Sequence, residues 1–190
     1  MRDNFGREIN YLRISVTDRC NLRCRYCMPA DGFSNIIPRE QILSFEEIVR
    51  ITQAAARLGI SKIRLTGGEP LVRHGIVDLI SKISAVGGIN EIALTTNGVL
   101  LAEMAEDLKR AGVTRVNISI DTMDPEKYAR ITRGGDLNRV LAGIEAAKKA
   151  GLTPVKLNVG RPGRLQRGPS SAILIGADAK SRITSCALSS

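Results

Sequence analysis

Three cysteines within eight residues are the feature of this chain best suited to chemistry. Cys20, Cys24 and Cys27 lie in the segment Cys-Asn-Leu-Arg-Cys-Arg-Tyr-Cys. Thiolates bind soft metals, and a closed zinc site and a closed four-iron cluster each take four ligands from the protein. Three thiolates therefore predict a metal centre that keeps one coordination position open for a substrate or a cofactor.

Zinc is the simpler alternative for these cysteines. A closed zinc site needs a fourth ligand, and the candidates are His74, the only histidine, and the remote Cys186. Neither lies at the spacing of a local zinc motif. An iron–sulfur cluster with three protein ligands needs no fourth side chain, because its free iron can bind a cofactor. The sequence favours such a cluster and leaves a zinc-binding module open.

A repeated unit predicts the elements that position the cysteines. A glycine followed by an apolar residue, two other residues and a second apolar residue recurs at 59–63, 88–92, 112–116 and 151–155. Glycine tolerates the left-handed conformation that ends a helix, so each repeat predicts a helix end that leads into a strand. Ser44 and Glu47 form a capping box that begins the first helix. With an earlier strand near 11–16, the pattern predicts five strands and four main helices in alternation, which is typical of a parallel α/β sheet.

Alternation along the strands predicts two different faces. Residues at even offsets from each repeat glycine are apolar, and those at odd offsets are nearly all polar. The second set is Arg64, Thr66, Ala93, Thr95, Asn117, Ser119, Asp121, Lys156 and Asn158, joined by Arg13, Ser15 and Thr17 of the first strand. A parallel sheet covered by helices on both faces would be apolar on both. We therefore expect a partial (βα) barrel with helices outside and a polar ligand inside; an open sheet with one solvated face is the alternative.

The cysteine loop follows the first strand, so it is expected at the carboxyl-terminal edge, where α/β barrels bind their ligands. The chain has 190 residues and a formal net charge of +9, of which +4 falls in residues 160–190. This mild excess suits an anionic small substrate, with solvated basic side chains as the alternative, and requires no nucleic acid. No apolar run approaches the roughly 18 residues of a membrane span, and no signal peptide is recognisable. We expect a soluble, cytoplasmic protein without a membrane partner.

The cysteine segment resembles the hallmark of the radical S-adenosylmethionine superfamily, Cys-x3-Cys-x-aromatic-Cys after the first barrel strand, with Tyr26 at the aromatic position. The segment 67–70, Gly-Gly-Glu-Pro, is similar to the second motif of that superfamily. The resemblance implies one 4Fe-4S cluster on Cys20, Cys24 and Cys27, with the fourth iron open to S-adenosylmethionine. It also implies an electron donor and reductive cleavage of S-adenosylmethionine to a 5'-deoxyadenosyl radical, with no catalytic residue beyond cluster and cofactor.

Residues 4–159 are similar to the molybdenum cofactor biosynthesis protein A family, the GTP 3',8-cyclases, which are lyases. The segments that carry the resemblance are 4–7, 11–20, 62–71, 94–98, 117–121 and 155–159. The resemblance implies GTP contacts at Arg13, Arg64, Thr95 and Lys156, and S-adenosylmethionine contacts at Tyr26, Gly68 and Ser119, beside Gly67, which allows a close backbone approach. Three cations facing one cavity would repel one another unless an anion lay between them, and a nucleoside triphosphate supplies that anion. A homodimer stays open.

The resemblance stops after Val159, where the family continues to a second three-cysteine cluster. Residues 160–190 are rich in Ser, Gly and Arg without any period, which is typical of a disordered segment. We expect a chain that is C-terminally truncated or frameshifted after about residue 159, with a radical S-adenosylmethionine partial barrel over 1–159, an aberrant tail over 160–190 and no second cluster. The strand edge left by the cut is expected to be unpaired. A non-catalytic iron–sulfur or zinc-binding module and a radical enzyme with another substrate remain as alternatives.

Overall fold

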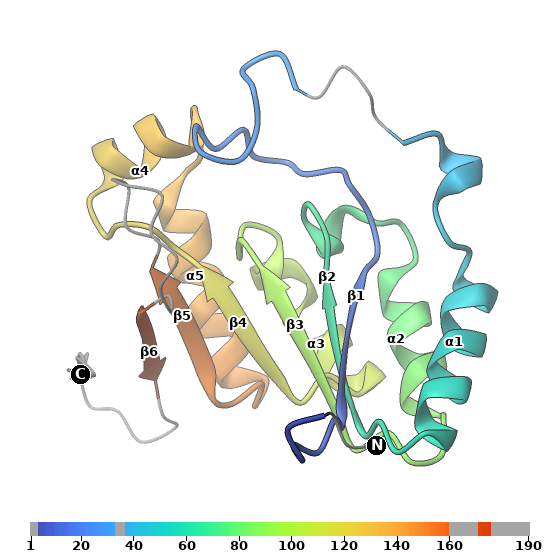
Figure 1. Ribbon diagram of the computed structural model, residues 1–190. Helices are drawn as coiled ribbons and strands as arrows, with labels where there is room; N and C mark the ends of the chain where they lie inside the picture. Colours follow the sequence, from blue (N-terminus) through green and yellow to red (C-terminus); the bar gives the residue numbers. More distant parts are fainter. Residues whose placement is uncertain (1–3, 33–36, 160–170, 176–190) are drawn as a thin grey trace.

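The structure, a computed structural model, describes residues 4–32, 37–159 and 171–175 (Figure 1). The strands are β1 (Tyr11–Ser15), β2 (Lys62–Thr66), β3 (Glu91–Thr96), β4 (Arg115–Ser119), β5 (Val155–Val159) and β6 (Ser171–Ile175). The helices are α1 (Phe45–Arg57), α2 (Ile76–Ser84), α3 (Leu101–Ala111), α4 (Pro125–Thr132) and α5 (Leu137–Lys149), with short 3-10 turns η1 (Arg39–Gln41) and η2 (Pro70–Val72). Strand and helix alternate as the glycine repeat predicts.

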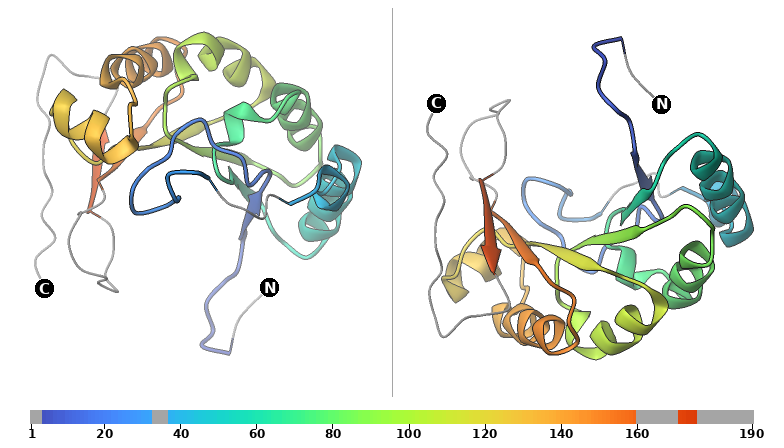
Figure 2. Two further views of the ribbon diagram at one scale, coloured as in Figure 1. Left: turned by 90° about the horizontal axis from the view of Figure 1, so that it is seen from above. Right: turned by 90° about the horizontal axis from the view of Figure 1, so that it is seen from below.

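The sheet has the order β1-β2-β3-β4-β5-β6, and its first five strands are parallel. Seen along the strands, the sheet is curved, and α1, α2, α3 and α5 form an arc on its convex side (Figure 2). No helix of the described part covers the concave side. The strands that the structure describes do not close, because β1 pairs with β2 alone. The predicted partial barrel with outer helices is confirmed.

The predicted apolar face of the sheet is also confirmed. Ile63, Leu65, Leu94, Ile118 and Leu157 of the even set are all buried against the helices. The four repeat glycines have left-handed φ angles, which are 92° at Gly59, 93° at Gly88, 111° at Gly112 and 72° at Gly151. Gly59, Gly112 and Gly151 therefore end α1, α3 and α5 in the conformation that glycine adopts at little cost, whereas α2 ends at Ser84 and Gly88 lies four residues beyond it. The repeat predicts the architecture because it encodes both the helix ends and the strand faces.

Helix α1 begins at the predicted capping box. The Ser44 hydroxyl accepts a hydrogen bond from the Glu47 amide, and the Glu47 carboxylate accepts one from the Ser44 amide. Helix α4 was not among the four main helices that the sequence predicts. It begins where the Asp124 carboxylate accepts from the Lys127 amide, with Pro125 at its first position. This cap was recognisable in the sequence, but the helix has only eight residues and lies within a β4–β5 connection that already holds α5.

The disordered tail predicted over residues 160–190 is wrong for five of them. Ser171–Ile175 form β6, which pairs antiparallel with β5 and places Val159 opposite Ser171. The segment is a run of small and aliphatic residues, and an edge strand offers unpaired backbone groups to such a run. The β5 edge that was expected to be unpaired is therefore paired. The other residues of this tail, with Cys186, lie outside the described residues, and the boundary near residue 159 stays a prediction.

Within the described ranges, none of the helices has the length and apolar character needed to cross a membrane.

Candidate active site

The three cysteines lie together at the carboxyl-terminal edge of the sheet, as predicted. The chain leaves β1 at Ser15 and passes over this edge, where the cysteine loop of residues 16–32 arches towards α4 (Figures 1 and 2). A cavity of about 290 Å³ opens beneath the loop. Its lining consists of Ser15, Thr17, Asp18, Cys20, Leu22, Cys24, Cys27, Met28, Gly67 and Gly68. The structure thus brings both sequence motifs to one cavity.

All three thiols are free, and two of them are half-buried. The Cys20 Sγ atom accepts hydrogen bonds from the Leu22 amide at 3.4 Å and from Asn97 Nδ2 at 3.8 Å. Burial raises the pKa of the Cys20 thiol, and burial followed by the charge of Asp121 raises the pKa of the Cys24 thiol. A cationic metal centre would oppose this effect, because it lowers the pKa of both thiols and favours their thiolate form.

The arrangement fits a cluster better than a single ion. Among the residues described, no three His, Cys, Asp or Glu side chains converge as ligands of one metal ion. A cluster tolerates wider spacing, because each thiolate binds a different iron atom. His74, the candidate fourth zinc ligand, lines a neighbouring cavity of about 770 Å³ with Phe45 and Asp78 rather than the cysteine cavity. The donor set therefore matches a cluster with three cysteine ligands.

Gly67 and Gly68 bind the end of β2 to the end of β1. The Gly68 amide donates to the Thr17 carbonyl at 2.7 Å, and the Glu69 amide donates to the Arg19 carbonyl at 2.8 Å. A Cβ atom on Gly68 would lie 2.3 Å from the Arg19 carbonyl oxygen, and one on Gly67 would lie 2.4 Å from the Thr17 carbonyl oxygen. Only glycine permits this approach, so the two glycines hold the start of the cysteine loop against the sheet.

Glu69 is buried to 1 % exposure and joins the ends of β2 and β3. Its Oε1 atom accepts from Thr96 Oγ1 at 2.7 Å and from the Leu71 amide at 3.0 Å, and its Oε2 atom accepts from the Asn97 amide at 2.6 Å. Burial raises the pKa of the Glu69 carboxyl, although the three donors act in the opposite direction. Because the Asn97 side chain in turn reaches Cys20, this carboxylate orders part of the cysteine site from beneath.

Replacing Glu69 with alanine is expected to destabilise the fold by about 2 kcal/mol, because two buried donors and one part-buried donor lose their acceptor. The free energy of unfolding in urea measures this. Glu106→Ala is the matched control, since Glu106 is exposed on α3. Equal stability of the two variants would contradict the assigned role.

The predicted S-adenosylmethionine contacts are only partly gathered at the cavity. Gly67 and Gly68 line it, whereas the Tyr26 side chain is 65 % exposed and its hydroxyl donates to Asp121 Oδ2 at 2.8 Å. Burial of the hydroxyl and its bond to Asp121 raise the pKa of Tyr26. Ser119 is exposed at the end of β4, beside Asn158 of β5. These residues share the carboxyl-terminal edge, but Tyr26 and Ser119 do not line the cavity.

The predicted GTP contacts lie on the concave face in two adjacent rows. Arg13 is directly opposite Arg64 in the β1–β2 register. Thr95 and Lys156 are both opposite Asn117, which places them in one row across β3, β4 and β5. Within the described part of the chain, neither arginine nor Lys156 has a carboxylate partner, and the buried Arg64 Nε atom has no acceptor. The Arg64 guanidinium stacks on the Tyr11 ring, 5.2 Å from its centroid.

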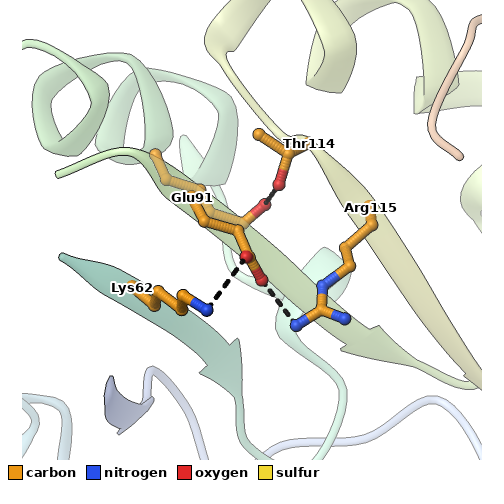
Figure 3. Close-up of polar contacts among 5 residues, drawn as sticks. Lys62, Glu91, Thr114 and Arg115 are labelled. Carbon is orange, nitrogen blue, oxygen red and sulfur yellow. Dashed lines mark hydrogen bonds and ion pairs between the residues drawn. The ribbon is translucent and has the colours of Figure 1, made fainter. Parts of the chain in front are cut away.

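A separate ion-pair cluster lies at the amino-terminal ends of β2, β3 and β4 (Figure 3). The Glu91 carboxylate pairs with Arg115 at 2.5 Å and lies 3.9 Å from Lys62 Nζ. The Thr114 hydroxyl donates to the Ile92 carbonyl at 2.9 Å beside it. Glu91 therefore offsets positive charge at this end of the concave face, whereas Arg13 and Arg64 have no carboxylate partner in the part of the chain that the structure describes.

Sequence reasoning missed several of these residues. The sequence presents Asn97 only as part of the segment 94–98, and Asp121 only as part of the segment 117–121 and of the polar set on the strands. Glu69 was quoted for its motif without its partners on β3. In each case the residue type was recognisable, but a partner lies in a segment distant in sequence, the cysteine loop for Asn97 and Asp121 and the end of β3 for Glu69, and cannot be identified from local spacing.

Comparisons with known proteins agree with this geometry. The family model described as "Radical SAM superfamily" matches residues 14–163. Over 159 residues the chain is 59% identical to a GTP 3',8-cyclase of Alkaliphilus oremlandii and 55% identical to one of Thermodesulfovibrio yellowstonii, covering 84% of this chain and 49% of each relative. The crystal structure of methylornithine synthase matches with a TM-score of 0.64 at 20% identity, over 78% of this chain and 44% of that one. The chain spans about half the length of the curated relatives that it matches.

Proposed function

Because this chain belongs to the radical S-adenosylmethionine superfamily, we propose that it carries the cluster-binding and nucleotide-binding barrel of a GTP 3',8-cyclase of molybdenum cofactor biosynthesis. The superfamily implies a 4Fe-4S cluster and S-adenosylmethionine. The observation that carries the proposal is the cavity that gathers three cysteines and two glycines at the edge of a concave face bearing uncompensated cations. The curated relatives support GTP as the substrate.

Cys20, Cys24 and Cys27 would hold one cluster, which when bound supplies the electron for reductive cleavage of S-adenosylmethionine. An external electron donor must restore that electron. The chain's own contribution is to shield and orient the sulfurs. The Leu22 amide and Asn97 donate to Cys20, and such donors stabilise the thiolate charge and raise the potential of the centre.

Gly67 and Gly68 would offer backbone atoms to the methionine end of S-adenosylmethionine, because no side chain covers them on the cavity side. Tyr26 and Ser119 would contact its nucleoside end. Asp121 holds the Tyr26 hydroxyl at 2.8 Å, which restricts the otherwise exposed ring. The residues at this edge thus bind and orient the cofactor and take no proton in the reaction.

Arg13, Arg64 and Lys156 would bind the triphosphate of GTP, with Thr95 beside them on the same face. Guanidinium groups bind phosphate through paired, charge-assisted hydrogen bonds, and the free Nε–H of Arg64 offers one such donor. The anion would also remove the repulsion between the facing Arg13 and Arg64. Charge complementarity is therefore the physical basis of the proposed substrate.

Replacing Arg64 with methionine is expected to weaken GTP binding by about tenfold to a hundredfold, because a charge-assisted contact to phosphate is lost. Equilibrium dialysis of GTP and of guanosine against the reconstituted chain measures this, and guanosine binding is expected to be unchanged. Arg50→Met is the control, since Arg50 is exposed on α1 of the convex side. A parallel loss of guanosine binding, or equal GTP binding by parent and variant, would contradict the proposal.

A further inference from the structure

The end of α4 lies directly against the cysteine loop. The Arg25 amide donates to the Ile131 carbonyl at 2.9 Å, and the Arg23 amide donates to the Thr132 carbonyl at 3.3 Å. The Arg25 side chain adds a bond from Nε to the Arg130 carbonyl at 2.8 Å. The carbonyl groups in the last turn of a helix receive no hydrogen bond from a backbone N–H of the same helix, so their donors must come from elsewhere. Here the cysteine loop supplies them.

Arg133 completes this contact from the C-cap of α4. Its Nη1 atom donates to the Arg23 carbonyl at 2.8 Å and to the Met28 carbonyl at 2.7 Å. These two carbonyls belong to the residue just before Cys24 and the residue just after Cys27. One guanidinium nitrogen therefore fixes both ends of the segment that carries two of the three proposed cluster ligands.

The conformation of Arg133 separates its side-chain role from its backbone role. With φ 56° and ψ 56°, it is the one non-glycine residue with a positive φ in the described part of the chain. Glycine would adopt this conformation with less strain. A C-cap alone therefore does not require arginine at this position, whereas two fixed bonds to the loop do.

Apolar packing lies beneath these hydrogen bonds. Leu22 and Tyr128 are both buried, and a Cβ atom on Gly135 would lie 3.1 Å from Leu22 Cδ2 and 3.0 Å from Tyr128 Cε1. The Gly135 amide donates to Thr132 Oγ1 at 3.0 Å, which holds the chain after α4 close to the helix. The loop and the end of α4 are thus held together by buried apolar packing and, nearer the surface, by hydrogen bonds that include those of Arg133.

We propose that Arg133 is a positioning residue that holds Cys24 and Cys27 in place for the cluster by bonding the Arg23 and Met28 carbonyls. The proposal rests on the cluster site proposed above, and it concerns how that site is ordered. Among the described residues, removal of the guanidinium leaves residues 23–28 hydrogen-bonded to α4 through the Arg23 amide and through the Arg25 amide and side chain. We therefore expect this segment to open more often and to release a bound cluster faster.

Hydrogen exchange in the metal-free, full 190-residue chain tests the positioning directly. In Arg133→Gly the amides of residues 23–28 are expected to exchange about fivefold to tenfold faster, while amides of β3 exchange at the parent rate. Arg130→Ala is the matched control, because it removes a positive charge from the same helix end, and the exposed Arg130 side chain makes no hydrogen bond or ion pair among the described residues. An unchanged loop, or equal acceleration of loop and β3, would overturn the proposal.

Two further measurements keep the test independent of any one variant. Arg133→Lys keeps the positive charge but cannot make both hydrogen bonds in fixed geometry. The amides of its cysteine loop are therefore also expected to exchange faster than those of the parent. Exchange at the parent rate would show that charge alone is responsible and would reject the positioning role. Iron release to a chelator from the reconstituted chain is expected to be several-fold faster in Arg133→Gly. If no cluster forms in the parent, the proposed function fails, while the exchange data still decide whether Arg133 positions the loop.

Discussion

Replacing Cys24 with alanine is expected to reduce bound iron from about four atoms per chain to below one after anaerobic reconstitution. The same loss is expected for Cys20→Ala and Cys27→Ala, because each variant leaves only two thiolates in the cavity. A cluster with two protein ligands exposes a second iron and dissociates readily. Iron and sulfide analysis of the desalted protein, with its visible absorption, measures the effect.

Cys186→Ser is the matched control for these three variants. Cys186 is the fourth cysteine of the sequence, remote from the other three and outside the described residues, and the proposed cluster takes its ligands from Cys20, Cys24 and Cys27. The control is expected to bind as much iron as the parent. Equal iron loss in Cys186→Ser and Cys24→Ala would indicate a different ligand set. One zinc ion per chain with no iron would support the alternative of a zinc-binding module.

Replacing Gly68 with alanine is expected to destabilise the chain by about 3 to 4 kcal/mol. The added Cβ atom would lie 2.3 Å from the Arg19 carbonyl oxygen and 2.6 Å from that of Asp18, both of them backbone atoms that cannot rotate away. The loop must shift, and the bond from the Gly68 amide to the Thr17 carbonyl is strained or lost. Thermal and urea unfolding of the metal-free chain measure the effect.

Gly87→Ala is the control for this steric argument. A Cβ atom on Gly87 would meet nothing within 4 Å, and Gly87 is not one of the glycines with a positive φ. Its replacement is expected to leave stability unchanged or slightly higher, because alanine restricts the unfolded chain. A Gly68→Ala protein as stable as Gly87→Ala would show that the loop does not pack on β2 as described.

Much of the architecture could be predicted from the sequence because it is encoded locally. The repeat glycines mark helix ends, and alternation from each glycine assigns side chains such as Leu65 and Arg64 to opposite faces. Together these two local rules predict five parallel strands, outer helices and a polar concave face. The cysteine spacing and the segment 67–70 are also local, so the site's position at the end of β1 and β2 followed from the order of the elements.

The parts that could not be predicted depend on contacts between distant segments. Arg133 meets the cysteine loop across more than a hundred residues of sequence. Glu69 takes two of its three donors from the end of β3, and β6 pairs with a strand edge that was expected to be unpaired. The local sequence around these residues does not identify the hydrogen-bond or strand partner that each of them has in the fold. The same limit explains why Tyr26 was predicted as a cofactor contact without its bond to Asp121.

Radical chemistry by this chain is decided by the formation of 5'-deoxyadenosine from S-adenosylmethionine by the anaerobically reconstituted, chemically reduced 190-residue protein. The account predicts 5'-deoxyadenosine in equal amount to methionine, and its loss in Cys24→Ala. An iron-loaded parent chain that produces no 5'-deoxyadenosine above the level of Cys24→Ala would contradict the proposed cleavage of S-adenosylmethionine.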